Sequence, residues 1–173
     1  MLIAITGTPG TGKTSACDIL ARRGYAVIDL DEFARREDCI VGRDEERETD
    51  EVDVEALRTR LRVTAKLAFL KSHYSHLLPA NIVIVLRCCP SVLRKRLEAR
   101  SWSARKVREN VEAEAIDAIT QEAATRSPMV YEIDTTDAEP AGTADEILAI
   151  LQGKTQGHEA GSVDWSEEVL SWY

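Results

Sequence analysis

The sequence predicts an α/β fold in which a central parallel five-stranded sheet carries helices on both faces. Short apolar runs of strand length alternate along the chain with segments whose apolar residues recur at helical spacing. Such alternation gives three layers, because each parallel strand reaches the next through a crossover that packs on the sheet. The five runs are Leu2–Thr6, Ala26–Leu30, Lys66–Lys71, Ile82–Leu86 and Val130–Ile133.

Helices and loops are expected between these strands. A helix over Ser15–Arg23 should end at Gly24, because glycine readily adopts the left-handed conformation of helix ends. Up to the fourth strand, the other expected elements are a helical turn over Phe33–Arg36, a solvated loop over Gly42–Asp50, a helix from Asp53 and a loop over His73–Pro79. After it we expect a helix from Pro90, a break at Ser101–Ser103 and one longer helix through Val107, Val111, Ala115 and Ile119. A capping box between Thr143 and Glu146 should open the last helix of this part.

Composition limits the classes of function. The 173 residues carry a net charge of −8, which argues against extensive direct nucleic acid binding, because that rewards clustered Lys and Arg. No apolar run approaches the roughly 20 residues that a membrane-spanning helix needs. The N-terminus leads directly into a glycine-rich loop, which leaves no room for a cleaved signal peptide. We therefore expect a cytoplasmic protein without membrane contact.

The glycine-rich loop carries the clearest chemical signal. Residues 7–14 read GTPGTGKT and match the phosphate-binding P-loop pattern G-x-x-x-x-G-K-[ST], between an apolar strand and an amphipathic helix. Glycine lets successive backbone amides converge on phosphate oxygens, and the helix N-terminus adds a positive dipole end. Lys13 is expected to reach the β- and γ-phosphates, and the Thr14 hydroxyl to bind Mg²⁺.

Several arginines are candidates for phosphate contacts elsewhere. Arg35 and Arg36 follow the second strand, where an acceptor-binding insert over about 31–52 is expected. Arg96 and Arg100 are four residues apart and adjoin a predicted lid over about 99–109. Transfer between two nucleotides requires such cations, because they align the phosphates and exclude water. The alternative for each group is ion pairing on a solvated helix.

Taken together, several motifs resemble one family. Besides the P-loop they are residues 72–79 (SHYSHLLP), 85–90 (VLRCCP), 105–114 (RKVRENVEAE) and 130–136 (VYEIDTT). The set resembles archaeal adenylate kinases related to the eukaryotic nuclear adenylate kinase isoenzyme six. The likeness runs from Met1 to about Leu151, which predicts a kinase domain over 1–152 and a linker and C-terminal tail over 153–173.

The resemblance implies a three-layer P-loop nucleoside monophosphate kinase fold with a short lid. It implies transfer of the γ-phosphate of MgATP to AMP, an ATPase side activity, and a role in small ribosomal subunit maturation through a small-subunit ribosomal protein. By position it assigns AMP binding to Arg35, ATP contact to Arg100 and a place near the phosphates to His73. It assigns ATP binding to Gly10, Gly12, Lys13, Thr14 and Ser15, to which the P-loop pattern adds Gly7 and Thr11. With the arginine pair beside the predicted lid, the expected catalytic residues are Lys13, His73, Arg96 and Arg100.

One position departs from the family pattern. Lys71 stands two residues before His73, where the family usually has an acidic residue that helps to place Mg²⁺. Either catalysis is weakened or Asp29 or Asp31 takes over that task.

Other functions stay open on the sequence. One is an ATP-gated ribosome assembly factor with little kinase activity, in which the charged insert and the tail around Trp165 and Trp172 contact a partner. Another is a P-loop kinase for a different small acceptor, such as shikimate or gluconate, since these share loop and architecture. A GTPase is disfavoured, because no guanine-reading Asn-Lys-x-Asp motif occurs.

Overall fold

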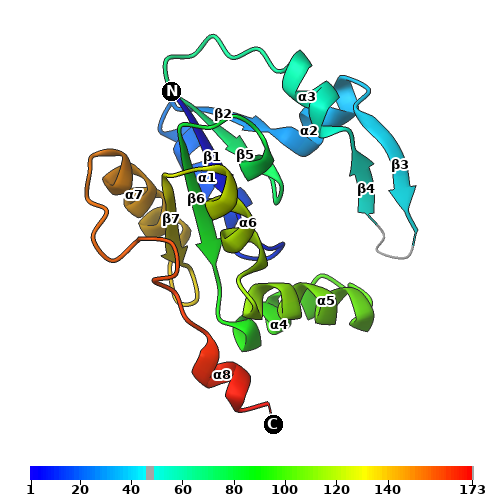
Figure 1. The fold of residues 1–173 in the computed structure, drawn as a ribbon, viewed down its shortest axis with the longest axis vertical. Helices are drawn as coiled ribbons and strands as arrows, with labels where there is room; N and C mark the ends of the chain where they lie inside the picture. The colour runs from blue at the N-terminus through cyan, green and yellow to red at the C-terminus, as the bar shows by residue number, and fades with distance from the viewer. Residues whose placement is uncertain (46–48, 173) are drawn as a thin grey trace.

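The computed structural model describes residues 1–45 and 49–172 and has the expected α/β fold (Figure 1). Five parallel strands form the central sheet in the spatial order β2-β5-β1-β6-β7. Their bounds are β1 Leu2–Thr6, β2 Ala26–Asp29, β5 Ala68–Lys71, β6 Ile82–Arg87 and β7 Val130–Asp134. All five predicted strands are therefore present. The order places β1, which leads into the glycine-rich loop, at the centre of the sheet.

Helices cover both faces of this sheet. Helices α1 (Lys13–Arg22) and α7 (Pro140–Leu151) pack on one face, and α6 (Ala118–Arg126) packs on the other. The remaining helices are α2 Leu30–Arg36, α3 Val54–Arg60, α4 Pro90–Glu98, α5 Ala104–Ala115 and α8 Ser166–Leu170, with a 3₁₀ turn over Ser75–Leu77. None of the helices in the described part of the chain combines the length and the apolar composition that crossing a bilayer requires.

Alternation along the strands explains the two cores. In β1, Ile3 and Ile5 pack with α1 and α7, whereas Ala4 between them packs with α6. In β6, Ile84 and Val85 divide in the same way. Because successive strand side chains point to opposite faces and both faces are covered, these strands read as unbroken apolar runs.

The predicted solvated loop over Gly42–Asp50 is wrong for most of its length. The segment forms an antiparallel hairpin of β3 (Ile40–Asp44) and β4 (Thr49–Val52), which projects from the sheet beside α2 and α3 (Figure 1). Ile40 and Val52 anchor it on a small apolar core under α2 and α3. Residues 46–48 of the predicted loop and Tyr173 of the predicted tail lie outside the described residues.

The single long helix predicted through Val107 and Ile119 is also wrong. Helix α5 ends at Ala115, and α6 begins at Ala118. Asp117 between them has a φ of 55°, a left-handed conformation that few residues other than glycine adopt without strain. Aspartate is among the residues that adopt this conformation most readily, and the break allows the Asp117 carboxylate to pair with the buried guanidinium of Arg87.

The capping box predicted at Thr143 does not open a helix. Helix α7 begins three residues earlier, with Glu139 as the preceding residue and Pro140 in the first turn. Proline suits the first turn because its fixed φ is helical and the amide it lacks has no partner there. Thr143 lies inside the helix, and its hydroxyl donates back to the Glu139 carbonyl at 3.4 Å.

The segment predicted as a linker lies against the edge strand β7. Glu159 bridges Tyr131, and the Glu132 amide donates to the His158 carbonyl at 2.7 Å. Farther along, the Trp165 indole donates to Glu114 at 3.4 Å, and α8 follows directly. The tail is thus docked on the α/β core along most of its length (Figure 1).

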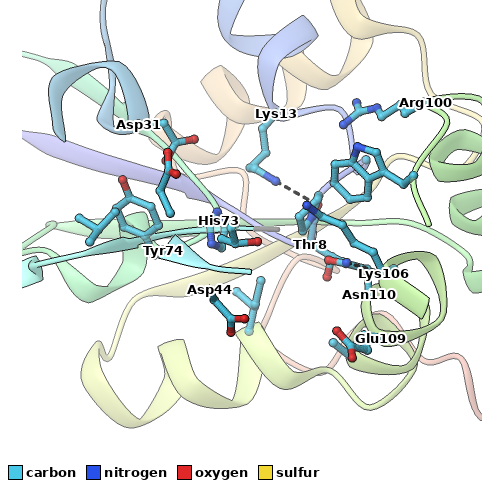
Figure 2. A pocket seen from close by; sticks show the side chains of 18 of the residues that line it. Thr8, Lys13, Asp31, Asp44, His73, Tyr74, Arg100, Lys106, Glu109 and Asn110 are labelled. Carbon is cyan, nitrogen blue, oxygen red and sulfur yellow. Dashed lines mark hydrogen bonds between the residues drawn. The ribbon is translucent and has the colours of Figure 1, made fainter. Parts of the chain in front are cut away.

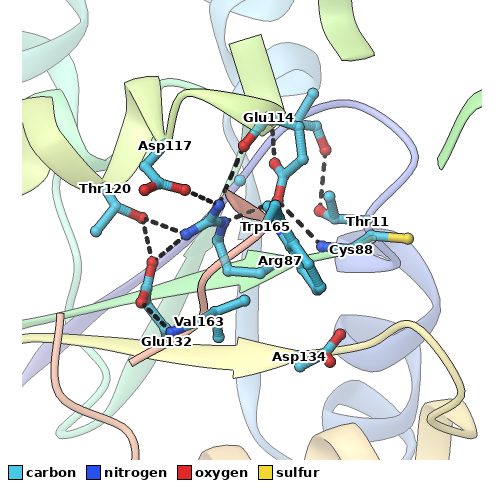
Figure 3. A network of polar contacts seen from close by, with 12 residues as sticks. Thr11, Arg87, Cys88, Glu114, Asp117, Thr120, Glu132, Asp134, Val163 and Trp165 are labelled. Carbon is cyan, nitrogen blue, oxygen red and sulfur yellow. Dashed lines mark hydrogen bonds and ion pairs between the residues drawn. The ribbon is translucent and has the colours of Figure 1, made fainter. Parts of the chain in front are cut away.

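A buried ion network joins these pieces (Figure 3). Arg87, only 1% exposed, ends β6 and pairs with Glu114 of α5, Asp117 at the helix break and Glu132 of β7. Glu132 also accepts from the amides of Gly161 and Val163 in the C-terminal segment, at 2.9 and 3.1 Å. Burial alone would lower the pKa of Arg87, but these carboxylates raise it, so the guanidinium stays charged. This one side chain connects β6 to β7 and to the junction of α5 and α6.

Replacing Arg87 should destabilise the fold strongly. An Arg87→Met variant leaves three carboxylates facing one another without their cation, and we expect a loss of about 3–5 kcal/mol in the free energy of unfolding. Chemical denaturation monitored by circular dichroism measures it. The matched control is Arg94→Met at an exposed position of α4. Its free energy of unfolding should lie within about 0.5 kcal/mol of that of the parent. Equal stability of both variants would contradict the role of the network.

Candidate active site

The glycine-rich loop connects β1 to α1 in a conformation that only glycine permits at two positions. Gly7 has a φ of 130°, and a Cβ there would lie 2.3 Å from the Leu86 carbonyl oxygen. Gly12 has a φ of 94° and immediately precedes α1. Any other residue at these positions would be strained or would collide. The loop therefore wraps around a concavity at the N-terminus of α1, as phosphate binding requires.

Lys13 spans the mouth of this loop. Its Nζ donates to the Gly7 carbonyl at 2.6 Å and to the Thr8 carbonyl at 2.9 Å. Burial lowers the pKa of Lys13 to about 8, and the charge of Arg100 acts in the same direction, while Glu114 and Asp31 partly restore it. The lysine is thus a poorly solvated cation, which interacts strongly with any anion that reaches it.

The loop is held from behind by Glu114. The Thr8 hydroxyl donates to Glu114 Oε2 at 2.6 Å, while Arg87 Nε and the Cys88 amide donate to Oε1 at 2.8 and 3.1 Å. On the other side of the loop, the Thr135 hydroxyl donates to the Thr11 carbonyl at 2.8 Å. The buried ion network therefore fixes the position of the phosphate-binding loop (Figure 3).

A cleft of about 980 Å³ opens in front of the loop. It is large for a single small-molecule site, since ligand pockets are typically about 300–1,000 Å³. Two groups of cationic side chains line it, one beside the P-loop and the lid and the other on α2 and the hairpin. They are Lys13, Arg100 and Lys106 in the first group, and Arg35 and Arg43 in the second.

The side of the cleft formed by the predicted lid residues is built around Trp102. The Lys106 ammonium lies 4.5 Å from the centre of the indole ring, and the Arg100 guanidinium lies 5.8 Å from it. Such cation–π contacts favour a fixed arrangement of the two charges. Arg100 and Lys106 both line the cleft and lie across from Lys13 (Figure 2). The structure thus brings the predicted lid residue Arg100 to the phosphate-binding loop.

His73 lies at the floor of the same cleft (Figure 2). Its ring contacts Tyr74 edge to face, with the ring centres 5.0 Å apart. Burial, followed by the charge of Lys13, lowers the pKa of His73 below its usual 6.5. The imidazole is therefore neutral at pH 7, so it can donate or accept a hydrogen bond near phosphates without adding charge.

The unusual Lys71 has a defined partner. Its Nζ lies 2.5 Å from Asp29 Oδ2. Although burial works against both charges, this bond raises the pKa of Lys71 and lowers that of Asp29. Asp29 is thereby committed to a structural pair and to capping α2. Asp31 instead lines the cleft, where its carboxylate accepts from the Ser72 hydroxyl at 3.0 Å.

The predicted residues are not all brought together. The P-loop residues Gly10, Gly12, Lys13, Thr14 and Ser15 line the cleft with Arg35, His73 and Arg100. Gly7 and Thr11 shape the loop from behind it. Arg96 is not among the described residues that line the cleft, because its guanidinium donates to the Thr135 and Thr136 carbonyls, both at 2.8 Å. Arg36 also lies outside that lining and pairs with Glu37.

Sequence reasoning missed two parts of the site. Glu114 was assigned no function, although its spacing of four from Asn110, which lines the cleft, puts both residues on one helical face. Arg43 and Asp50 fell inside the presumed loop. The paired strands that place them at the cleft lack a strong apolar pattern, so the sequence carried little signal for them.

The pKa of Lys13 makes a pH-dependence prediction. A bound polyphosphate stabilises the ammonium form, so binding near pH 8–9 should take up a proton, and affinity should fall up to about tenfold per pH unit above pH 8. Calorimetric titration of nucleoside triphosphate in buffers of different ionisation enthalpy measures the uptake. A Lys13→Arg variant, whose guanidinium does not titrate, is the control. Proton uptake equal in both proteins would assign it to another group.

Comparison with known proteins places this site in a family. The family model described as "AAA domain" matches residues 3–117. Proteins named "Putative adenylate kinase" are 42% identical in Archaeoglobus fulgidus, covering 98% of this chain and 94% of that protein, and 44% identical in Methanothermobacter thermautotrophicus, covering 98% and 99%.

Solved structures confirm the fold. A shikimate kinase from Acinetobacter baumannii in complex with shikimate superposes with a TM-score of 0.58 at 19% identity, over 90% of this chain and 94% of that one. A deoxyadenosine kinase from M. mycoides superposes with a TM-score of 0.56 at 14% identity, over 88% and 100%. With sequence similarity over nearly its full length, the chain belongs to the archaeal family named "Putative adenylate kinase", and its P-loop core to the AAA domain family.

Proposed function

We propose that this protein is an adenylate kinase that transfers the γ-phosphate of ATP to AMP. The observation that carries the proposal is one continuous cleft with cations at two places: Lys13 and Arg100 by the P-loop, and Arg35 on α2. Two phosphorylated ligands that meet end to end need this distribution of charge. Family membership supports the same assignment.

The chemistry needs alignment more than a strong base. In the proposed reaction, an oxygen of the AMP phosphate attacks the γ-phosphorus, the bond to the β,γ-bridging oxygen breaks, and two ADP molecules result. The attacking phosphate is already an anion, so no side chain has to remove a proton from it. Lys13 and Arg100 stabilise the charge on the transferring group, Arg35 orients the acceptor, and His73 offers a neutral hydrogen bond.

Arg96 takes a positioning role in this proposal rather than a direct one. Its two hydrogen bonds to the carbonyls of Thr135 and Thr136 tie α4 to the end of β7. Thr135 in turn donates to the P-loop at Thr11. Arg96 therefore supports the loop through its neighbours.

The function is tested by ADP formation from ATP with and without AMP. We expect formation to depend on AMP and to fall by at least about 100-fold in a Lys13→Met variant, since that lysine contacts the transferred group. Lys154→Met, at an exposed position after α7, is the control. Shikimate and other nucleoside monophosphates serve as alternative acceptors. ADP formation indifferent to AMP, or faster with shikimate, would count against the proposal.

The residues present fit a nucleotide-bound Mg²⁺. No group of three or more acidic, His or Cys side chains able to hold a metal occurs in residues 1–45 and 49–172. Mg²⁺ in phosphoryl-transfer sites needs only one or two protein oxygens, with nucleotide phosphates and water completing its shell. We propose that the Thr14 hydroxyl and the Asp31 carboxylate supply them. When bound, the ion neutralises phosphate charge.

Asp31 should therefore matter for the metal and Asp29 should not. With Mn²⁺ in place of Mg²⁺, an Asp31→Asn variant should bind the metal about tenfold more weakly in the ATP complex, measured by electron paramagnetic resonance. Asp29→Asn should leave that affinity unchanged, because the Asp29 carboxylate is paired with Lys71. A loss confined to the Asp29 variant would reverse the assignment.

Three further assignments belong to the proposal, and two of them, ATP hydrolysis and the ribosomal role, rest on the resemblance to the nuclear isoenzyme six. We include slow ATP hydrolysis, to be measured as phosphate release without AMP. We also include a cytoplasmic location, which four free cysteines fit because thiols persist in reducing compartments.

The third is a role in maturation of the small ribosomal subunit. Leu170 and Trp172 in the tail are 73% and 42% exposed and offer apolar contact surface. ATP-dependent cosedimentation with purified small subunits tests this role, and its persistence in a Leu170→Ser, Trp172→Ser variant would exclude the tail as the contact.

A further inference from the structure

A cluster of three charged side chains lies at the hairpin side of the cleft. Asp50 of β4 lies between two arginines, with Oδ2 3.4 Å from Arg35 NH2 and Oδ1 3.6 Å from Arg43 NH1. All three residues line the cleft. A carboxylate that bridges two guanidinium groups occupies a position that a phosphate would also fill, since arginine binds both anions through paired N–H donors.

The placement of Arg43 depends on an irregularity in the hairpin. Ile40 pairs with Val52, whereas Arg43 pairs with Asp50, so β3 has one residue more than β4 between these pairs, and the register shifts at Val41. Residues two apart on β4 face the same side, so Asp50 and Val52 share a face. The bulge that accommodates the extra residue therefore puts Arg43 on that face too, although in regular pairing its spacing of three from Ile40 would send it to the opposite face. Bulges of this kind redirect side chains next to active sites.

The bridge itself is weak enough to exchange. Its N–O separations exceed those of good charge-assisted hydrogen bonds, which are about 2.7–2.9 Å. The Arg35 and Arg43 side chains are 61% and 56% exposed, and that of Asp50 is 29% exposed. Ion pairs so open to solvent contribute little, whereas a dianionic phosphate presents twice the charge and more acceptor oxygens.

We propose that Arg43 is a second phosphate contact of the acceptor site, and that Asp50 holds the place of the acceptor's phosphate until a phosphate monoester displaces it. This inference rests on the proposed function and specifies its substrate class. Arg35 and Arg43 clamp the acceptor phosphate from α2 and the hairpin. Asp50 makes binding depend on the charge of the ligand, because only a group with more negative charge than a carboxylate competes well for both arginines. An uncharged or monocarboxylate acceptor gains little there.

The test measures AMP affinity by calorimetry in the full-length protein and in variants. Arg43→Gln should weaken AMP binding by about tenfold or more, the loss expected for a charge-assisted contact. Asp50→Asn should tighten it about three- to fivefold by removing the competitor. In the double variant the gain from Asp50→Asn should shrink, because the two effects act through one contact. ATP affinity should stay at the parent value throughout.

The matched control is Arg36→Gln. Arg36 is adjacent to Arg35, similarly exposed and paired with Glu37, but is not among the described residues that line the cleft. The Arg36→Gln variant should therefore bind AMP as tightly as the parent. Adenosine, which lacks the phosphate, should bind the parent and the Arg43→Gln variant equally. Equal losses for AMP and adenosine would show a merely structural role for Arg43 and overturn the inference.

The remaining outcomes separate the inference from the function on which it rests. If the parent binds AMP and forms ADP from it but Arg43→Gln and Asp50→Asn match the parent, the clamp is wrong and the kinase assignment stands. Weaker AMP binding by Asp50→Asn would mean that the carboxylate organises the arginines rather than competing for them, which overturns the displacement. A parent protein that binds no nucleoside monophosphate would overturn both.

Discussion

The architecture of this molecule depends on the neutralisation of Arg87. A guanidinium at the end of the central strand β6 is withdrawn from water, and burial on that scale is tolerated only with closely placed anions. Two segments, the junction of α5 and α6 and the strand β7, supply the carboxylates, so a shift of either one would leave a buried charge without its partner. Glu114 extends the constraint to the P-loop through Thr8, and Glu132 extends it to the C-terminal segment through two backbone amides. The same ions that hold the fold together thus fix the phosphate-binding loop.

The cations of the cleft also have anionic partners close by. Lys13 is desolvated and close to Arg100, so its pKa is depressed. Each cation raises the affinity of the cleft for polyphosphate while destabilising its neighbours when no anion compensates them. Glu114, Asp31 and Asp50 supply that compensation at different points. In this way a chain with a net charge of −8 presents a locally cationic site.

The sequence predicted the strands and the P-loop well, because both leave local signatures. Buried strands read as continuous apolar runs, and the loop needs glycine at fixed positions, as the close approach of Gly7 to Leu86 illustrates. The break at Asp117 and the hairpin were not predictable in this way. Asp117 has a left-handed conformation, and its carboxylate pairs with Arg87, which lies thirty residues earlier in the chain and so leaves no local pattern. The hairpin alternates weakly, and its charged residues resemble a solvated loop until α2 and α3 are packed beneath it.

Tertiary pairing also decided between residues that the sequence left equivalent. The sequence left Asp29 and Asp31 as equal candidates for a carboxylate in the cleft; in the structure Asp29 pairs with Lys71, and Asp31 lines the cleft. Arg96 and Arg100 share a helical spacing, yet one donates to backbone carbonyls and the other lines the cleft. Local pattern identified the kinds of side chain present, while their direction depended on neighbours far away in the chain.

The extra residue in β3 is accommodated by the bulge at Val41 and not by the pairing that follows it. Removing Val41 would leave Ile40 and Arg43 two residues apart, which is the spacing of Val52 and Asp50, so a regular hairpin would still put Arg43 opposite Asp50. Related chains that lack this residue can therefore keep the same two side chains opposite each other, whereas a chain that keeps the residue must keep the bulge as well.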